Sequence, residues 1–537
     1  ALLKGVLGAD RSLREAFAAL ALWPQLKIKI QGGRFDLLEP AAATPFAGFN
    51  AATVNLTARL GDGSRGLLLS AAPFSAEGAW APAKLEMTGG PGDVLKDTAF
   101  SLGGRRWAQG LAASVGLLLA NADSELQISG HVIPGSDAVG PKASIDMHCR
   151  KVGLQWWRLA PQAIDDINVD LKLELGADGK AGSMTVKATE IRVAEARFGA
   201  TLTLSDINTD KIAAHLELAM PKQDCGKVAH ALPASLVPTI GAIDAEGEAG
   251  WDFDLVLPLF NPYKGKLEAN LDDKTCKVTR FGELELGELA GDFARPVNES
   301  GTILEDQLIG PKSEAWVNIA DLPPWVPYAM MATEDAAFYH HRGLRLGLLS
   351  RAIKMCADYG RFVYGGSTIT QQLVKNLYLT RDKYLGRKFE ELLIVWHMER
   401  SLMADAELEE GADQARATKD RIMELYINGI EFGPQLYGIV RAAKAYYDKP
   451  AAELTPLEAA FLAANKPCPK CGHKRFTTQK WTPWWQERMV GIMKRMLKDG
   501  IISDAQFVAE APYVPRFVGW PQTEAKGPGA QIGGVEE

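Results

Sequence analysis

The sequence lacks any uninterrupted apolar run long enough to cross a membrane. A spanning helix needs about 18 or more consecutive apolar residues, and charged residues interrupt even the amphipathic stretch at residues 1–26. A leader or anchor removed from the N-terminus would leave the same pattern. We therefore expect that an anchor is missing here, and the absence does not exclude attachment to a membrane.

Cysteine is also scarce. Six cysteines in 537 residues are too few for a disulfide scaffold, and they do not fix the compartment. Cys468, Cys471 and His473 resemble half of a zinc knuckle. Because no second cysteine pair stands nearby, a local disulfide or two free thiols are favoured over zinc.

Length and charge indicate a folded protein of several domains. A chain of 537 residues exceeds one ordinary hydrophobic core, so two or three domains are expected. The net charge is -7, yet residues 311–500 hold 27 Lys and Arg against 22 Asp and Glu. This part is mildly basic, which suits an anionic ligand or a membrane surface.

Residues 27–300 have the pattern of antiparallel strands. Apolar residues alternate at Leu171, Leu173 and Leu175, and similar runs are separated by turns such as Gly61-Asp62-Gly63. Short turns with little helical periodicity predict a long antiparallel sheet, a sandwich or an open curved roll. The strands show no fixed repeat length.

Helical spacing replaces this pattern near residue 300. We predict an α+β multidomain protein with a β-rich antiparallel accessory domain (1–300), a mainly α domain (311–500) and a C-terminal extension and tail (501–537). Within the α domain, the acidic, Ala-rich residues 403–418 are expected to form an exposed insertion that leaves any active site intact.

Two carboxylates follow an apolar helical stretch in the α domain. The segment AMMAT leads directly into Glu334 and Asp335, so these acids are expected at the edge of a buried helix. Partial burial would make a carboxylate a usable general base near neutral pH. The alternative is an acid pair at a helix end that a nearby Arg or Lys neutralises.

A second stretch has the features of an anion site. The double glycine at 365–366 permits a tight turn, and Thr368 with Gln371 has the spacing of a capping box that opens a helix. Gln372 and Lys375 share one face of that helix, whose N-terminal N–H groups favour anions. The residues expected on its buried stripe are Ile369, Leu373 and Leu377.

A third helix combines one acid with two cations. Arg387, Lys388 and Glu391 occupy one arc of it, an arrangement that can hold a pyrophosphate. The apolar residues Phe389, Leu392, Leu393 and Trp396 cluster on the other side. The alternative is an ordinary solvated face with salt bridges.

Five segments in the α domain occur in a specific order. They are EDAAFYHHRG, GGSTITQQLVKN, RKFEE, KDRIMELYINGIEFG and GIVRAAKAYYDKPAAELTPLEAAFLA. Through them, residues from about 316 to 500 resemble the family 51 glycosyltransferases, the peptidoglycan polymerases found alone or fused to penicillin-binding transpeptidase domains. The resemblance implies a mainly α, lysozyme-like glycosyltransferase domain.

The resemblance also implies roles for individual residues. Glu334 matches the catalytic base and Glu391 the second essential acid. The residues that match the substrate-binding positions are Asp335, Phe338, His341, Thr368, Gln372, Lys375, Asn376, Arg387 and Lys388. Glu424, Tyr426 and Asn428 fall in the fourth segment, where mainly structural roles are expected.

The implied activity is the polymerisation of lipid II at the periplasmic face of a bacterial inner membrane. Glu334 would take the proton from the 4-hydroxyl of the acceptor sugar, and that oxygen attacks the anomeric carbon with inversion and release of undecaprenyl pyrophosphate. Lys375, Arg387 and Lys388 would offset the charge on the leaving group. A divalent cation, Mg²⁺ or Mn²⁺, fits at the pyrophosphate, although the sequence contains no dedicated metal site.

The expected enzyme is monofunctional. The sequence has no Ser-x-x-Lys motif, and fewer than forty residues follow the α domain, so we expect no transpeptidase activity. Trp481, Trp484 and Trp485 fit either a membrane interface or core packing. In strand pattern alone, the β-rich region vaguely resembles the AsmA-like, lipid-handling proteins of the bacterial envelope. We expect this region to bind a cell-wall synthesis partner, and we expect no nucleic-acid partner.

Two other functions fit part of the pattern. A muramidase-like glycoside hydrolase also uses two carboxylates across a sugar cleft. Such a hydrolase has no pyrophosphate for Lys375, Arg387 and Lys388 to hold. A non-catalytic cell-envelope scaffold would have no need for the acids and cations that every motif contains.

Overall fold

The chain divides into two compact units. In this computed structural model the described residues are 27–37, 47–61, 64–73, 81–90, 94–104, 118–135, 140–207, 209–284, 286–299, 302–359, 366–380, 382, 384–405 and 412–520. The first unit comprises Ala1–Leu284, Leu349–Gly365 and Lys383–Glu390. The second comprises Glu285–Leu348, Gly366–Asp382 and Glu391–Glu537.

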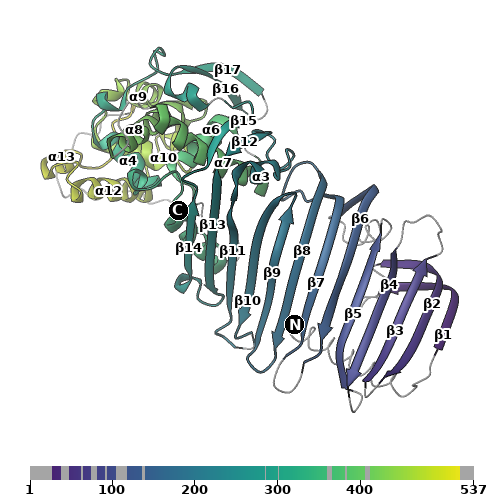
Figure 1. Ribbon diagram of the computed structural model, residues 1–537. Coiled ribbons are helices and arrows are strands. Elements are labelled where there is room, and N and C mark those ends of the chain that lie inside the picture. Colours follow the sequence, from purple (N-terminus) through teal and green to yellow (C-terminus); the bar gives the residue numbers. More distant parts are fainter. Residues whose placement is uncertain are drawn as a thin grey trace. The chain divides into compact units, whose positions relative to one another are not determined.

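The first unit is built on one antiparallel sheet of 13 strands, which confirms the expected β-rich region (Figure 1). The strand order follows the chain from β1 to β11 and continues with β13 and β14. The strands are β1 (Lys27–Leu37), β2 (Ala47–Gly61), β3 (Ser64–Pro73), β4 (Ala81–Gly90), β5 (Val94–Gly104), β6 (Leu118–Ile133), β7 (Lys142–Leu154), β8 (Ile164–Asp178), β9 (Ser183–Val193), β10 (Ala196–Ser205), β11 (Ala213–Asp224), β13 (Glu248–Pro258) and β14 (Lys266–Asp272).

On strands β7 to β9 the alternating sequence gives the sheet a more apolar face. Leu173 on β8 lies opposite Ile145 on β7 and Ala188 on β9. Successive side chains of a strand point to opposite faces, so Lys172 and Glu174 are exposed while Leu173 is half-buried. The alternation read from the sequence therefore corresponds to a real division of the sheet into two faces.

A small additional core lies within the first unit. Strand β12 (Ile243–Glu246) pairs with β15 (Lys277–Phe281), and both belong to the same unit as the short helix α3 (Cys225–His230). A disulfide joins Cys225 to Cys276, and Val237 and Ile240 are almost fully buried. The segment that contains Val237 and Ile240 is therefore firmly packed.

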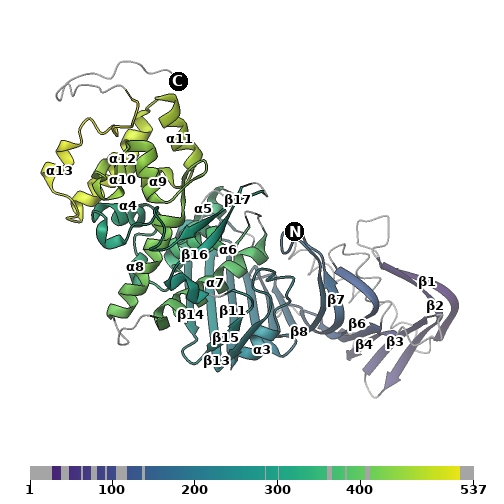
Figure 2. The ribbon, with the colours of Figure 1, turned by 90° about the horizontal axis from the view of Figure 1, so that it is seen from above.

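The second unit is mainly helical, as expected (Figure 2). Its helices are α4 (Trp325–Glu334), α6 (Ile369–Tyr378), α8 (Ala412–Gly429), α9 (Ile439–Tyr447), α10 (Pro456–Asn465), α11 (Pro469–Thr478), α12 (Pro483–Lys498) and α13 (Asp504–Ala509). Its short strands are β16 (Phe293–Glu299), β17 (Thr302–Ile309), β18 (Glu431–Gly433) and β19 (Leu436–Tyr437). The division between the units falls within α5 (Leu346–Tyr359) and within α7 (Leu385–Asp405).

Helix α10 forms the centre of the second unit. Thr455 and Glu458 make a capping box at its start, with Pro456 in the first turn. All ten residues of α10 are buried, and the helix packs against α4, α11 and α12. Because a helix that is apolar all round has no solvent-facing side, it can be stable only inside such a bundle.

One buried ion pair joins three helices of this unit. The Lys419 ammonium on α8 lies 2.6 Å from Oε1 of Glu399 on α7. Thr370 on α6 donates to the same oxygen over 2.7 Å. Both charged side chains are at most 6% exposed, and Lys419 also lies over the Phe338 ring. Burial lowers the pKa of Lys419, while Glu399 opposes that shift.

Several surface expectations can be compared with the structure. Residues 403–418 were expected to be exposed, but Gln414 and Thr418 are buried because they lie on the inner side of α8; residues 406–411 lie outside the described part. Trp485 belongs to the core, whereas Trp484 is 58% exposed. The cysteines at 468 and 471 form the local disulfide that was one of the alternatives.

The ends of the units differ from the expected domain limits. The expected boundary near residue 300 falls within the hairpin β16–β17, which belongs to the second unit. Residues 521–537 of the expected tail lie outside the described part. Of the helices described, none is both long and apolar enough to span a bilayer.

The buried ion pair yields a stability prediction. In Lys419→Met, Glu399 keeps its charge but loses its buried partner, and such a loss costs about 3–5 kcal/mol of the free energy of unfolding. Adding Glu399→Gln should restore much of that loss, because the neutral amide can still accept from Thr370. The free energies of unfolding of the single and the double variant are measured by denaturant unfolding, from the transition of the helical unit.

Lys444→Met is the matched control, since Lys444 forms an ion pair with Asp448 in which both side chains are well exposed. Exposed pairs contribute little, so this variant should unfold like the wild type. Equal losses in Lys419→Met and Lys444→Met would contradict the assigned role of the buried pair.

Candidate functional site

Glu334 is the last residue of α4, whose apolar residues Val326, Ala329 and Met330 are fully buried. The helix ends there because Asp335 leaves the helical conformation (φ -155°, ψ 75°). The Glu334 side chain is partly exposed, and its Oε2 accepts a hydrogen bond of 2.7 Å from Nε2 of Gln372. The structure therefore places Glu334 of the first stretch against Gln372 of the second.

The N-terminus of α6 is built as the sequence predicts. Thr368 accepts from the N–H of Gln371, and the Gln371 side chain accepts from the N–H of Thr368, which completes the capping box. The Thr368 hydroxyl also donates to the carbonyl of Gly343 over 2.6 Å. Gly343 has a φ of 75°, and a Cβ there would lie 2.4 Å from Val395. Only glycine fits this approach without strain.

Asp335 connects the two stretches. It is almost fully buried, and its Oδ2 accepts from Nε2 of His341 over 2.8 Å and from the N–H of Ile369 over 3.4 Å. Arg345 lies 3.7 Å from the other oxygen. A carboxylate is favoured at a helix N-terminus, so Asp335 holds the start of α6 beside the end of α4.

Tyr426 extends the contact of Glu334 and Gln372. Its hydroxyl donates to Oε1 of Gln372 over 3.0 Å, so the amide nitrogen of Gln372 faces Glu334. Burial raises the pKa of Tyr426 well above its usual value, and the charges of Glu334 and Asp335 raise it further. The phenol therefore stays protonated and remains a hydrogen-bond donor.

Lys466 is a cation in the same surroundings. It follows the buried helix α10, donates to the carbonyl of Glu431 over 3.0 Å, and lies 5.5 Å from the centre of the Tyr426 ring. Burial is the main reason that the pKa of Lys466 is lowered to about 7; Glu334 and Glu431 oppose this shift, and Lys375 adds a little to it. Its charge therefore changes near neutral pH.

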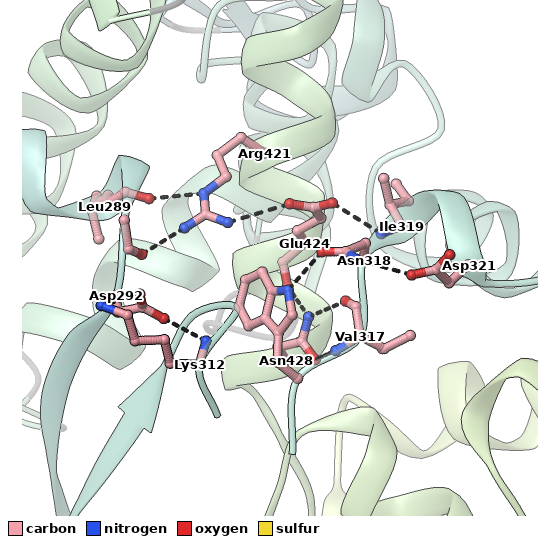
Figure 3. Close-up of polar contacts among 12 residues, drawn as sticks. Leu289, Asp292, Lys312, Val317, Asn318, Ile319, Asp321, Arg421, Glu424 and Asn428 are labelled. Atoms are coloured by element: carbon pink, nitrogen blue, oxygen red, sulfur yellow. Dashed lines mark hydrogen bonds and ion pairs between the residues drawn. The ribbon is translucent and has the colours of Figure 1, made fainter. Parts of the chain in front are cut away.

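The other residues of the fourth segment hold backbone in place (Figure 3). Glu424 accepts from the N–H of Ile319, and Asn428 both accepts from and donates to the backbone of Val317. Arg421 donates to the carbonyls of Leu289 and Gly291 and to Glu424. Glu424 and Asn428 thus make structural contacts, whereas Tyr426 contacts Gln372, the hydrogen-bond partner of the candidate base.

The remaining candidates fall into two groups by exposure. Asp335, Phe338, Thr368 and Glu391 are at most 2% exposed, and the His341 side chain is 9% exposed. Lys375 is exposed, and Gln372, Asn376, Arg387 and Lys388 are partly exposed. Side chains closed to solvent can shape a site, and only the second group together with Glu334 is open to a ligand.

The structure corrects the expected orientation of α7. Phe389, on the arc read as apolar, is 37% exposed, whereas Glu390 and Glu391 are buried. The buried face continues through Ile394, Val395 and Met398. Burial of Glu391 excludes the alternative of a solvated acid in a salt-bridged surface. Arg387 and Lys388 belong to the first unit and Glu391 to the second.

Sequence reasoning missed two residues near Glu334. Tyr426 was assigned a structural role, and Lys466 was not named. The sequence did contain a signal for Lys466. It directly follows the apolar helix PLEAAFLAAN, so its charge is expected next to the hydrophobic core. No local pattern marks Tyr426, whose partner Gln372 is 54 positions away in the sequence.

Two features of the first unit involve none of these candidates. His215, Glu217 and Asp254 on β11 and β13 are close enough to share a metal ion. A cavity of about 780 Å³ lies on β9, β10, β11, β13 and β14 and is lined by Arg197, Lys222 and other residues. Neither contains a residue of the five ordered segments.

Known proteins resemble the second half of this chain. A family model described as Transglycosylase matches residues 301–497. Penicillin-binding protein 1A of Aquifex aeolicus is 37% identical over 204 residues, which cover 37% of this chain and 25% of that protein. The biosynthetic peptidoglycan transglycosylase of Acinetobacter baumannii is 39% identical over 155 residues, which cover 29% of this chain and 62% of that protein.

A protein of the same description from Ralstonia nicotianae is 39% identical over 160 residues and is matched over 62% of its length. The chain thus spans less than two thirds of each of these relatives. The matched residues include the whole contact network of Glu334, Gln372, Tyr426 and Lys466. Residues 301–497 therefore match the transglycosylase family.

Proposed function

We propose that this protein is a peptidoglycan glycosyltransferase that polymerises lipid II into glycan strands at the bacterial cell envelope. The observation that carries the proposal is the hydrogen bond from Gln372 to Glu334, with Tyr426 fixing the amide. It gives one partly exposed carboxylate a defined orientation inside a domain of the transglycosylase family.

In the proposed reaction Glu334 is the general base. Gln372 donates to Oε2, and in this proposal Oε1 takes the proton of the acceptor 4-hydroxyl. As the acceptor oxygen loses its proton, it attacks the anomeric carbon of the growing chain. The configuration at that carbon inverts. The undecaprenyl pyrophosphate leaves with the electrons of the broken C–O bond.

Cations offset the negative charge on that leaving group. Lys375 is exposed on α6. The charges of Glu334 and Lys375 both act on the pKa of Lys466. Arg387 and Lys388 supply two further cations from the start of α7. Fixed positive charge at a developing anion lowers the barrier because it needs no reorganisation during the reaction. A divalent cation at the pyrophosphate remains a prediction.

The buried candidates have positioning roles in this proposal. Asp335, with His341 and the N–H of Ile369, keeps the end of α4 beside the start of α6. Thr368 caps α6, and Phe338 lies under the Lys419 ammonium. Glu391 is buried one turn after Arg387 and would orient groups near the pyrophosphate.

The deciding experiment is incubation of the protein with labelled lipid II in detergent and in bilayers, with and without divalent cation. Glycan polymer on a gel supports the proposal. Degradation of preformed peptidoglycan would instead indicate a muramidase-like hydrolase, and neither product would indicate a scaffold.

Glu334→Gln should lower kcat for polymerisation by about 10²–10⁴-fold, because a general base contributes that much. The amide keeps the size of the side chain, so the fold should persist. Glu453→Gln makes the same change at an exposed position of the same unit and should leave the rate unchanged. Polymerisation at the wild-type rate in Glu334→Gln would exclude it as the base.

Tyr426→Phe should lower kcat by about 10- to 100-fold, because a small misplacement of Glu334 through Gln372 has effects of that size. Tyr446→Phe is the matched control: its hydroxyl is equally buried but donates to the carbonyl of Phe432. Thermal unfolding should change similarly in both variants, whereas only Tyr426→Phe should lose activity. Equal kcat in both would show that Tyr426 does not act on Glu334.

Lys466 should give the pH profile an alkaline limb. Its pKa of about 7 is below the usual 10.5, so the ammonium is present below about pH 7 and is lost as the pH rises through that value. Lys466→Arg stays charged, so its rate should fall only at higher pH. Lys466→Met should be slow at every pH. If the rate of Lys466→Arg falls at the same pH as that of the wild type, another group causes the loss of activity at alkaline pH.

A further inference from the structure

The first turn of α7 is held by segments from much earlier in the chain, all within the first unit. The N–H of Leu385 donates to the carbonyl of Arg158 over 2.7 Å, and the N–H of Gly386 donates to that of Leu159 over 2.8 Å. The first N–H groups of a helix have no partner inside the helix. Here the β-rich region supplies those partners.

Glu390 makes a second attachment one turn later. Its side chain is fully buried, and Oε1 accepts from the N–H of Thr239 over 2.6 Å and from the N–H of Ile240 over 3.2 Å. Its Oε2 accepts from the Thr239 hydroxyl over 3.1 Å. A buried carboxylate needs such donors, since an unpaired charge in the interior is costly.

Gly386 brings the helix into direct contact with the same region. A Cβ at Gly386 would lie 2.8 Å from the carbonyl oxygen of Leu159 and 2.9 Å from that of Leu236. Both atoms are backbone and cannot rotate away. The turn therefore fits against segments 158–159 and 236–240 only while residue 386 has no side chain.

Arg387 and Lys388 lie between these two attachments. Residues three apart on a helix are neighbours, so Glu390 stands beside Arg387. Burial raises the pKa of Glu390, while the hydrogen bonds from Thr239 and Ile240 and, to a smaller extent, the Arg387 charge act in the opposite direction. Both cations are partly exposed. The backbone that carries them is thus fixed at residues 385–386 and again at residue 390.

We propose that Glu390, through Thr239 and Ile240, is a positioning residue that fixes Arg387 and Lys388 for a pyrophosphate-bearing substrate. The inference rests on the proposed function, and it gives Thr239 and Ile240 of the first unit a part in holding these two cations. Glu390 itself touches no substrate. Its loss leaves both cations in the chain but frees the turn that orients them.

The test compares Glu390→Ala with Glu390→Gln in the full-length protein. Alanine removes every acceptor, whereas glutamine keeps an oxygen for the two N–H groups and an amide that can donate to the Thr239 hydroxyl. Glu390→Ala should raise KM for lipid II about tenfold or more, the size expected for a lost charged hydrogen bond. Its kcat should change much less, and Glu390→Gln should stay near the wild-type KM.

A second variant tests the same attachment in case Glu390→Ala does not fold. Gly386→Ala keeps all charges but pushes the turn off the carbonyls of Leu159 and Leu236, and it should raise KM similarly. Asp244→Ala is the matched control, because Asp244 is a partly exposed acid of the same unit that pairs with Arg280 and His230 and makes no contact with α7 in the described residues. It should leave KM unchanged.

Hydrogen–deuterium exchange of residues 385–390 supplies a readout that needs no activity. Exchange there should accelerate in Glu390→Ala and Gly386→Ala but not in Glu390→Gln or Asp244→Ala. A wild-type KM in the first two variants, or an equal rise in Asp244→Ala, would overturn the inference. A wild-type protein that does not polymerise lipid II would refute the proposed function instead, while the exchange data would still test the attachment.

Discussion

The candidate site of this protein depends on one buried carboxylate, that of Asp335. It is closed to solvent, so it requires partners, and it takes them from His341 and from the N–H of Ile369. This pairing brings the end of α4 to the start of α6. Gln372, one turn into α6, then meets Glu334, and the rest of the site is arranged around that contact.

The surroundings of Glu334 combine a hydrogen-bond chain with nearby positive charge. Tyr426 orients Gln372 from the buried side, and its phenol stays neutral because burial disfavours the phenolate. Lys466 stands at the end of the fully buried helix α10, where loss of solvent makes its charge sensitive to pH. Both effects require the packed interior of the helical unit and would be absent in a solvated helix.

The start of α7 belongs to the first unit and finds its hydrogen-bond partners there. The helix starts with two cations, and its first N–H groups and Glu390 find their partners in segments 158–159 and 236–240. A helix start without such partners would leave polar groups unpaired.

The sequence alone determined the features that follow local rules. The alternation around Leu173 predicts a two-faced sheet, the spacing of Thr368 and Gln371 predicts the capping box, and five ordered segments indicate the family of the helical domain. Only the tertiary structure decided which face of α7 is buried and which residues reach Glu334. Glu390 can be buried because its donors come from about 150 positions away, and Tyr426 reaches Gln372 across 54. Local periodicity contains no information about such partners, because the free energy of a buried polar group depends on what distant segments bring to it.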